Sequence, residues 1–154
     1  MPANAIVLDA NLLVLLIVGA ASRSYIARHK RLRAYAARDF ALLTDMLSAA
    51  PRIILTPNTV TEASNLSGQI AEPARSHIFA VFRALLPTAD EIYVESTKAA
   101  NHMAFTRLGV ADAALLSIMA ENRTLVTADL DLYLEAARHG YAAINFNHLI
   151  EANR

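Results

Sequence analysis

The sequence predicts an α/β protein, a three-layer α/β/α domain around a central, mainly parallel sheet of five strands. Short apolar runs alternate with segments whose apolar residues recur at helical spacing, which is typical of parallel strands joined by crossover helices. The chain has 154 residues, of which 55% are hydrophobic and 18% are charged. This length and composition suit one well-packed domain over residues 1–154, and no repeat or linker divides the chain.

The elements follow from apolar runs and capping residues. The expected strands lie at residues 5–8, 53–55, 92–94, 125–127 and 142–144. Thr56 and Pro57 supply an N-cap and a proline at the first helical position, so a helix should begin there and reach residue 68 or 70. Pro73 begins the next helix, Ser96 caps one that reaches the Met103 region, and a Leu-Gly break ends that pattern. Further helices are expected at residues 39–50, 111–121 and 130–139 and at the C-terminus.

Several classes of protein are disfavoured by composition. There is no cysteine, so disulfides and thiolate metal sites cannot form. The longest apolar run, residues 12–21, is shorter than the ~20 residues of a membrane span. The N-terminus lacks the basic region of a signal peptide. A cytoplasmic protein without a membrane partner is therefore expected.

The net charge is zero, but the basic residues are unevenly distributed. No acid lies between Asp9 and Asp39, whereas this interval holds six of the 14 lysines and arginines. Such clusters attract nucleic-acid backbones. The candidate nucleic-acid contacts in this basic segment are Arg23, Arg28, Lys30, Arg31 and Arg33. The alternative is an exposed helix with solvated charges.

Acidic residues gather near the predicted carboxyl ends of the strands. Asp9 directly follows the first strand, Asp129 lies two residues past the fourth, and Asp131 lies two further on. Glu62 lies in the second turn of the helix after the second strand, and Asp112 opens the helix before the fourth strand. Ligands of parallel α/β sheets bind beyond this edge. Four carboxylates that converge there raise each other's pKa values unless a cation neutralises them, and Mg²⁺ prefers oxygen ligands.

Each acid also has a purely structural explanation. Asp9 and Asp129 can cap the helices that follow them, and Asp112 can favour a helix N-terminus through the dipole. Glu62 can belong to a capping box with Thr59. None of these explanations accounts for four acids at one edge of one sheet. Helical spacing adds that Asp112 and Glu62 each share a face with apolar residues.

Four stretches, "IVLDANLL", "TPNTVTEASNL", "GVADAALLSIMAEN" and "LVTADLDL", resemble in order and spacing the motifs of PIN-domain ribonucleases, the group that includes VapC-like toxins. The resemblance covers almost the whole chain. It implies a metal-dependent endoribonuclease that uses Mg²⁺ or Mn²⁺. The residues it assigns to catalysis and metal binding are Asp9, Glu62, Asp112 and Asp129. The supporting positions are Asn11, Thr127 and Asp131.

The partners that we expect are an RNA substrate, a second copy of the chain in a homodimer and, for a toxin, an antitoxin encoded separately. The span from residue 19 to 38 departs from the family, because it is longer and more basic than the usual short helix pair. Two alternatives stay open: an inactive PIN-type binding or scaffold module, and a 5′-nuclease-like enzyme that acts on DNA. A haloacid-dehalogenase-like phosphatase is disfavoured because Asn11 stands where that class needs an acid.

Overall fold

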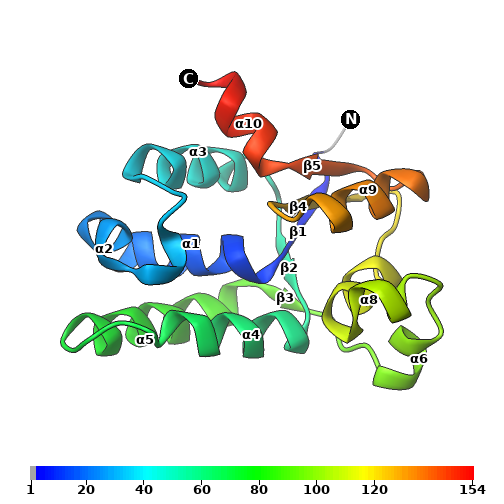
Figure 1. Cartoon of the computed structure of the whole chain (residues 1–154), viewed down its shortest axis with the longest axis horizontal. Coiled ribbons are helices and arrows are strands. Elements are labelled where there is room, and N and C mark those ends of the chain that lie inside the picture. The colour runs from blue at the N-terminus through cyan, green and yellow to red at the C-terminus, as the bar shows by residue number, and fades with distance from the viewer. Residues whose placement is uncertain (1–2) are drawn as a thin grey trace.

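The computed structural model describes residues 3–154, so residues 1–2 of the predicted domain lie outside the described residues. A five-stranded sheet in the order β3-β2-β1-β4-β5 lies between layers of helices, and every strand pair is parallel (Figure 1). The predicted α/β/α fold class is therefore confirmed. The strands are β1 (Ala5–Leu8), β2 (Ile53–Leu55), β3 (Asp90–Glu91), β4 (Arg123–Thr127) and β5 (Ala143–Asn145). The α-helices are α1 (Ala10–Ala21), α2 (Arg23–Arg28), α3 (Ala37–Ser48), α4 (Pro57–Ser67), α5 (Ala74–Leu85), α6 (Ser96–Ala100), α7 (Phe105–Leu108), α8 (Val110–Ser117), α9 (Leu130–Arg138) and α10 (Phe146–Ala152). Two 3-10 helices are η1 (Lys30–Leu32) and η2 (Leu86–Thr88).

Successive side chains of β1 point to opposite faces of the sheet and so belong to two separate layers of the core. Ile6 and Leu8 belong to one buried cluster, which includes side chains of α1, α3, α5 and α10. Val7 belongs to a second cluster, which includes side chains of α6, α8 and α9. Successive strand residues point to opposite faces, so a strand buried on both sides reads as a continuous apolar run.

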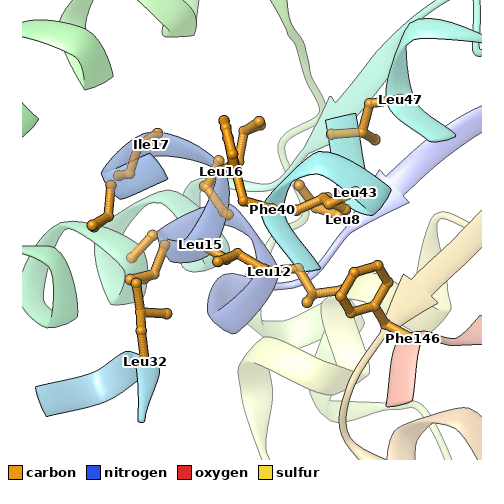
Figure 2. Close-up of a cluster of buried hydrophobic side chains, with 14 of the residues drawn as sticks. Leu8, Leu12, Leu15, Leu16, Ile17, Leu32, Phe40, Leu43, Leu47 and Phe146 are labelled. Carbon is orange, nitrogen blue, oxygen red and sulfur yellow. The ribbon is translucent and has the colours of Figure 1, made fainter. Parts of the chain in front are cut away.

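Helix α1 is buried on nearly every side, which explains why its sequence is apolar without a polar face. It packs against α2, α3, α4 and α5. Figure 2 shows Leu12, Leu15 and Leu16 among the side chains of its neighbours. Gly19 lets the ring of Phe40 lie directly on the helix, because a Cβ at this position would be 2.6 Å from Phe40 Cγ.

The third strand was predicted wrongly at residues 92–94. Strand β3 instead pairs Asp90 with Ile54 and Glu91 with Leu55. The Ile92 N–H donates to the Leu55 carbonyl at 2.9 Å. Beyond that bond β2 has ended and α4 begins, so the apolar residues after Ile92 have no strand to pair with.

Other boundaries shift for local reasons. Helix α3 begins at residue 37 rather than 39, because the Asp39 carboxylate accepts the Ala36 N–H at 2.8 Å and stabilises the first turn. Helix α8 ends at Ser117 rather than near residue 121, and Arg123 Nη1 donates to the Ile118 carbonyl at 2.5 Å just past the end.

The remaining predicted helices and strands differ from the structure by smaller amounts, apart from α6. Helix α6 ends at Ala100, before the Met103 region, and the separate short helix α7 was not predicted. Strand β4 begins two residues before the predicted start, and β5 lies one residue further along the chain. None of the helices described within residues 3–154 is both long enough and apolar enough to cross a membrane.

Candidate active site

A cleft of about 190 Å³ opens at the carboxyl edge of the sheet. It is lined by the N-terminal parts of α1, α4 and α8, by the last residue of α7, and by the residues that precede α1 and α9. Four carboxylates line it: Asp9, Glu62, Asp112 and Asp129. The uncharged residues of its wall are Ala10, Asn11, Thr59, Leu108, Ala111 and Leu115. Among the described residues, none of those lining the cleft is basic. The structure therefore brings together the four predicted acids and Asn11, from segments far apart in the sequence.

Asp9 is held rigidly at the end of β1. It is 5% exposed and acts as the N-cap of α1, with its Oδ1 accepting the Leu12 N–H at 3.3 Å. Its Oδ2 accepts a hydrogen bond from the Thr127 hydroxyl. Burial raises the pKa of Asp9 to about 6, although these two hydrogen bonds oppose the shift and the charges of Asp129 and Glu62 add to it. The capping explanation of Asp9 is therefore confirmed, and its role in metal binding stays a prediction.

Thr127 connects two of the acids. Its hydroxyl donates to Asp9 and accepts the Asp129 N–H at 3.0 Å, and its side chain is fully buried. Asp129 in turn caps α9, because its Oδ1 accepts the Leu132 N–H at 3.1 Å. The hydroxyl thereby fixes the relative positions of the first and fourth strand ends. A role for Thr127 in catalysis stays a prediction, but its contacts are those of an orienting residue.

Asp112 is the acid whose charge is least compensated. It lies in the first turn of α8, is partly buried, and has no hydrogen-bond partner for its side chain within residues 3–154. Burial, followed by the charges of Asp129, Asp9 and Glu62, raises the pKa of Asp112 to about 7.

Glu62 lies on the second turn of α4 and is exposed, so sharing a face with apolar residues does not bury it. The capping box with Thr59 does not form. Thr56 is the N-cap instead, and its hydroxyl oxygen accepts the Thr59 N–H at 3.2 Å. Glu62 therefore has no capping role and extends its carboxylate into the cleft.

The donor set suits a hard divalent ion. Carboxylate oxygens, with the Asn11 amide beside them, are the ligands that Mg²⁺ and Mn²⁺ accept, and nitrogen and sulfur donors are absent from the cleft lining described here. No three His, Asp or Glu side chains within residues 3–154 are arranged to hold one ion directly. Because four carboxylates repel one another, an ion would draw them together or reach some of them through water.

Two predicted groups lie outside the cleft. Asp131 is exposed in the first turn of α9 and does not line it. The basic segment begins at the far end of α1, a 12-residue helix about 18 Å long. All five of its candidate side chains are exposed, but the Arg31 Nε donates to Gln69 Oε1 at 2.8 Å, and Arg23 lies over the Phe40 ring. Contact between this segment and nucleic acid stays a prediction.

Two nearby residues were not assigned to the site from the sequence. Thr59 lines the cleft and is buried; its position three residues before Glu62, on one helical face, was a usable signal. Tyr35 is partly buried, and burial together with the charges of Asp9 and Asp39 raises its pKa to about 12. Its approach to Asp9 depends on the path of the chain after η1, which carries no sequence signal.

The comparisons with known proteins leave function open. No family model matches the chain, and no curated protein matches it. One solved structure, a domain of a functionally unknown protein from Methanocaldococcus jannaschii DSM 2661, is similar over 92% of this chain and 90% of that chain, with 17% identity and a TM-score of 0.45. Function therefore has to be inferred from the site itself.

Proposed function

We propose that the protein is a metal-dependent endoribonuclease that cleaves RNA phosphodiester bonds with Mg²⁺ or Mn²⁺. The observation that supports this proposal is the cleft lined by four carboxylates and no basic side chain, at the edge of a parallel sheet where ligands bind. Holding four like charges together is unfavourable unless a cation offsets them. The ordered motifs that resemble PIN-domain ribonucleases point to the same chemistry.

Each acid would contribute differently to holding the ion. Asp9 offers a fixed carboxylate, because the Leu12 N–H and the Thr127 hydroxyl hold both of its oxygens. Asp112 and Glu62 have no such restraints and can adjust. When bound, the metal ion would lower the pKa of a water molecule, orient the phosphodiester and offset charge on its oxygens. Asn11, exposed in the first turn of α1, can donate its amide to the substrate.

RNA cleavage by the full chain tests the proposal. Single-stranded and structured RNA are incubated with Mn²⁺, with Mg²⁺ and with chelator. We expect cleavage that chelator abolishes, and loss of most activity in Asp9→Asn and Asp112→Asn. Asp45→Asn is the matched control, because it removes an exposed acid on α3, away from the cleft. Full activity in chelator or in Asp112→Asn would exclude metal-dependent catalysis at this site.

A DNA substrate and a measurement of RNA binding, added to this assay, separate the alternatives. RNA binding without cleavage in either metal would favour a binding or scaffold module, and cleavage of DNA but not RNA would favour a 5′-nuclease-like enzyme. A role as a toxin is the further step that the resemblance implies. It predicts that expression of the wild type arrests the growth of a bacterial host, that Asp112→Asn does not, and that a separately encoded antitoxin relieves the arrest.

A further inference from the structure

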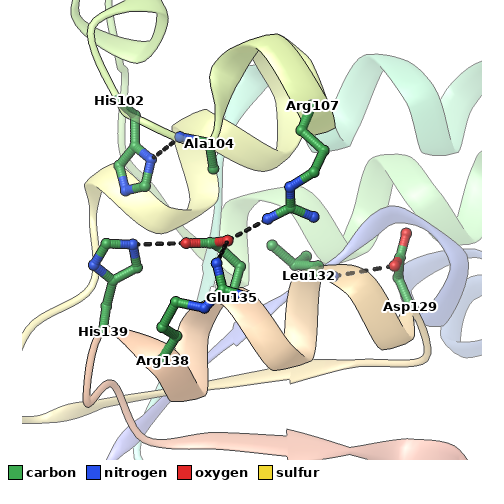
Figure 3. A network of polar contacts seen from close by, with 8 residues as sticks. All are labelled: His102, Ala104, Arg107, Asp129, Leu132, Glu135, Arg138 and His139. Atoms are coloured by element: carbon green, nitrogen blue, oxygen red, sulfur yellow. Dashed lines mark hydrogen bonds and ion pairs between the residues drawn. The ribbon is translucent and has the colours of Figure 1, made fainter.

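A second charged group lies beside the cleft, centred on Glu135 of α9. Its side chain is 3% exposed, and its carboxylate contacts two arginines and one histidine (Figure 3). Arg107 and Arg138 both approach Oε1, Arg138 at 3.4 Å, and His139 Nε2 lies 2.8 Å from Oε2. Burial opposes ionisation, but the hydrogen bond from His139 and the charges of Arg138 and Arg107 together hold the pKa of Glu135 below its ordinary value. Glu135 is therefore an ionised, fixed acceptor.

Such a carboxylate is unusual on the apolar face of a helix. Leu132 and Ala136, which flank it on this face, are fully buried. A buried charge is costly unless it is paired, so the three contacts explain how it is tolerated. They do not explain why an acid stands there, since an apolar side chain would pack at this position without them. A requirement to orient one of the partners would explain it.

Arg107 is the partner that adjoins a cleft residue along the chain. It belongs to α7 and directly precedes Leu108, which lines the cleft wall. Its side chain is 49% exposed, and only its Nη2 has a hydrogen-bond partner among the described residues. Figure 3 shows its guanidinium between Glu135 and the end of α9 that carries Asp129. Arg138 and His139 approach Glu135 from the opposite end of the helix.

Charge explains what this guanidinium could bind. The cleft holds four acids and no basic side chain, and the basic segment begins at the other end of α1. A nucleic-acid strand in the cleft would therefore need a nearby cation for its phosphates. Arginine presents planar N–H donors that match two phosphate oxygens, and the donors of Arg107 that Glu135 does not use have no partner among the described residues.

We infer, resting on the proposed nuclease function, that Arg107 binds a backbone phosphate of the RNA next to the scissile one, and that Glu135 is the positioning residue that orients its guanidinium. The α7–α8 connection supports this arrangement. Gly109, with φ +88°, is both the C-cap of α7 and the N-cap of α8, so a single residue joins the helix that carries Arg107 to the helix that carries Asp112.

The test compares Arg107→Gln with Arg138→Gln. Both variants remove one guanidinium that pairs with Glu135, but only Arg107 adjoins the cleft. kcat and KM for Mn²⁺-dependent cleavage of a single-stranded RNA oligonucleotide are measured over a range of salt concentrations. Arg107→Gln should raise KM by about tenfold with little change in kcat, and should reduce the log–log salt slope by about 0.7. Arg138→Gln should change neither KM nor the salt slope.

Glu135→Gln distinguishes orientation from a structural role. If Glu135 positions Arg107, this variant raises KM, and the double variant with Arg107→Gln raises it no further than the single variant does. Additive effects on KM would overturn the positioning role. Arg107→Lys, which keeps the ion pair but loses the forked contact, provides a second variant if Arg107→Gln does not fold, and KM should again rise.

Two outcomes would overturn the inference, and they differ. If the wild type cleaves RNA and both Arg107 variants keep its KM and salt slope, Arg107 does not bind a phosphate, and the proposed nuclease function stands. If the wild type neither cleaves nor binds RNA, the nuclease function itself fails, and this inference fails with it.

Discussion

Replacement of Asp112 by asparagine separates a metal-site acid from an ordinary helix-terminus acid. Asparagine is nearly isosteric with aspartate and uncharged. In the structure the Asp112 carboxylate has no hydrogen-bond partner within residues 3–154, and burial and the other three acids raise its pKa to about 7. Removing its charge should therefore stabilise the metal-free protein. If Asp112 only interacted favourably with the helix dipole, removing its charge would destabilise the protein instead.

The magnitude follows from the size of the pKa shift. A rise from 3.8 to about 7 on a fully buried group corresponds to roughly 4 kcal/mol, at 1.36 kcal/mol per unit. Asp112 is partly exposed, and solvent screens its interactions, so we expect about 1–2 kcal/mol. Asp112→Asn should accordingly unfold with a free energy about 1–2 kcal/mol higher than the wild type in chelator at pH 8.

The pH dependence has a definite sign. A carboxyl whose pKa is raised in the folded state binds its proton more tightly there, so the free energy of unfolding falls as the pH rises. For Asp112 this loss occurs between about pH 4, near the ordinary value of 3.8, and about pH 7. The advantage of Asp112→Asn should therefore shrink toward zero at pH 4. Asp9, whose pKa is raised to about 6, contributes in the same direction and is common to both proteins.

Urea unfolding in chelator at pH 4, 6 and 8, followed by thermal melts with Mn²⁺, measures these quantities. At a hundredfold excess of Mn²⁺ over its dissociation constant, the free energy of unfolding of the wild type should rise by roughly 2.7 kcal/mol, and that of Asp112→Asn should rise much less. Asp131→Asn is the control, because it replaces an exposed acid in the first turn of α9. Its free energy of unfolding should be about 0.3–1 kcal/mol lower than that of the wild type, and Mn²⁺ should stabilise it as much as the wild type. An Asp112→Asn protein that is destabilised in chelator and still stabilised by Mn²⁺ like the wild type would refute the reasoning.

Four further substitutions test the framework of the site. Thr127→Val should lower the free energy of unfolding, measured in urea, by about 1–3 kcal/mol at pH 8. The loss should be smaller at pH 5, because Asp9 is largely protonated there and the hydrogen bond from the hydroxyl no longer stabilises a charge. An equal loss at both pH values would contradict this. Gly109→Ala should lower the free energy of unfolding by about 1–3 kcal/mol, because φ +88° and ψ 179° suit only glycine, and it should also impair RNA cleavage. Gly140→Ala, at φ +76° past α9, should lower stability without impairing cleavage. Leu15→Ala should lower the free energy of unfolding by about 2–5 kcal/mol, and a smaller loss in thermal melts would show that α1 repacks.

The layered fold could be predicted because parallel strands buried on both faces leave a plain signal. Apolar runs such as residues 5–8 and 53–55 alternate with helical patterns, and both strands lie where predicted. Residues 92–94 are equally apolar, yet they form no strand, because β2 ends at Leu55 and offers no further partner. Strand length is thus set by a neighbour that the local sequence does not show.

The acids of the cleft could be located by the same local reasoning, since strand ends and helix starts share one edge. Their hydrogen bonds could not. The Thr127 hydroxyl reaches Asp9 across 118 residues of sequence, and only the pairing of β1 with β4 brings them together. Glu135 was not singled out from the sequence, although helical spacing places it on one face of α9 with the apolar residues Leu132 and Ala136. Its partner Arg107 lies 28 residues earlier, and no local pattern connects the two.

Capping would not prevent the proposed metal binding by Asp9 and Asp129, because capping uses only one of the two carboxylate oxygens of each acid. One oxygen of each accepts a backbone N–H at a helix N-terminus, where the dipole favours negative charge. The helix N-termini therefore favour negative charge at this crowded edge. Asp129→Asn tests this division of roles: asparagine caps helices about as well as aspartate, so stability should be retained while metal-dependent cleavage is lost. Asp129→Ala should lose cleavage and also about 1 kcal/mol of stability. Loss of stability in both variants alike would show that the charge, rather than the cap, stabilises this end of α9.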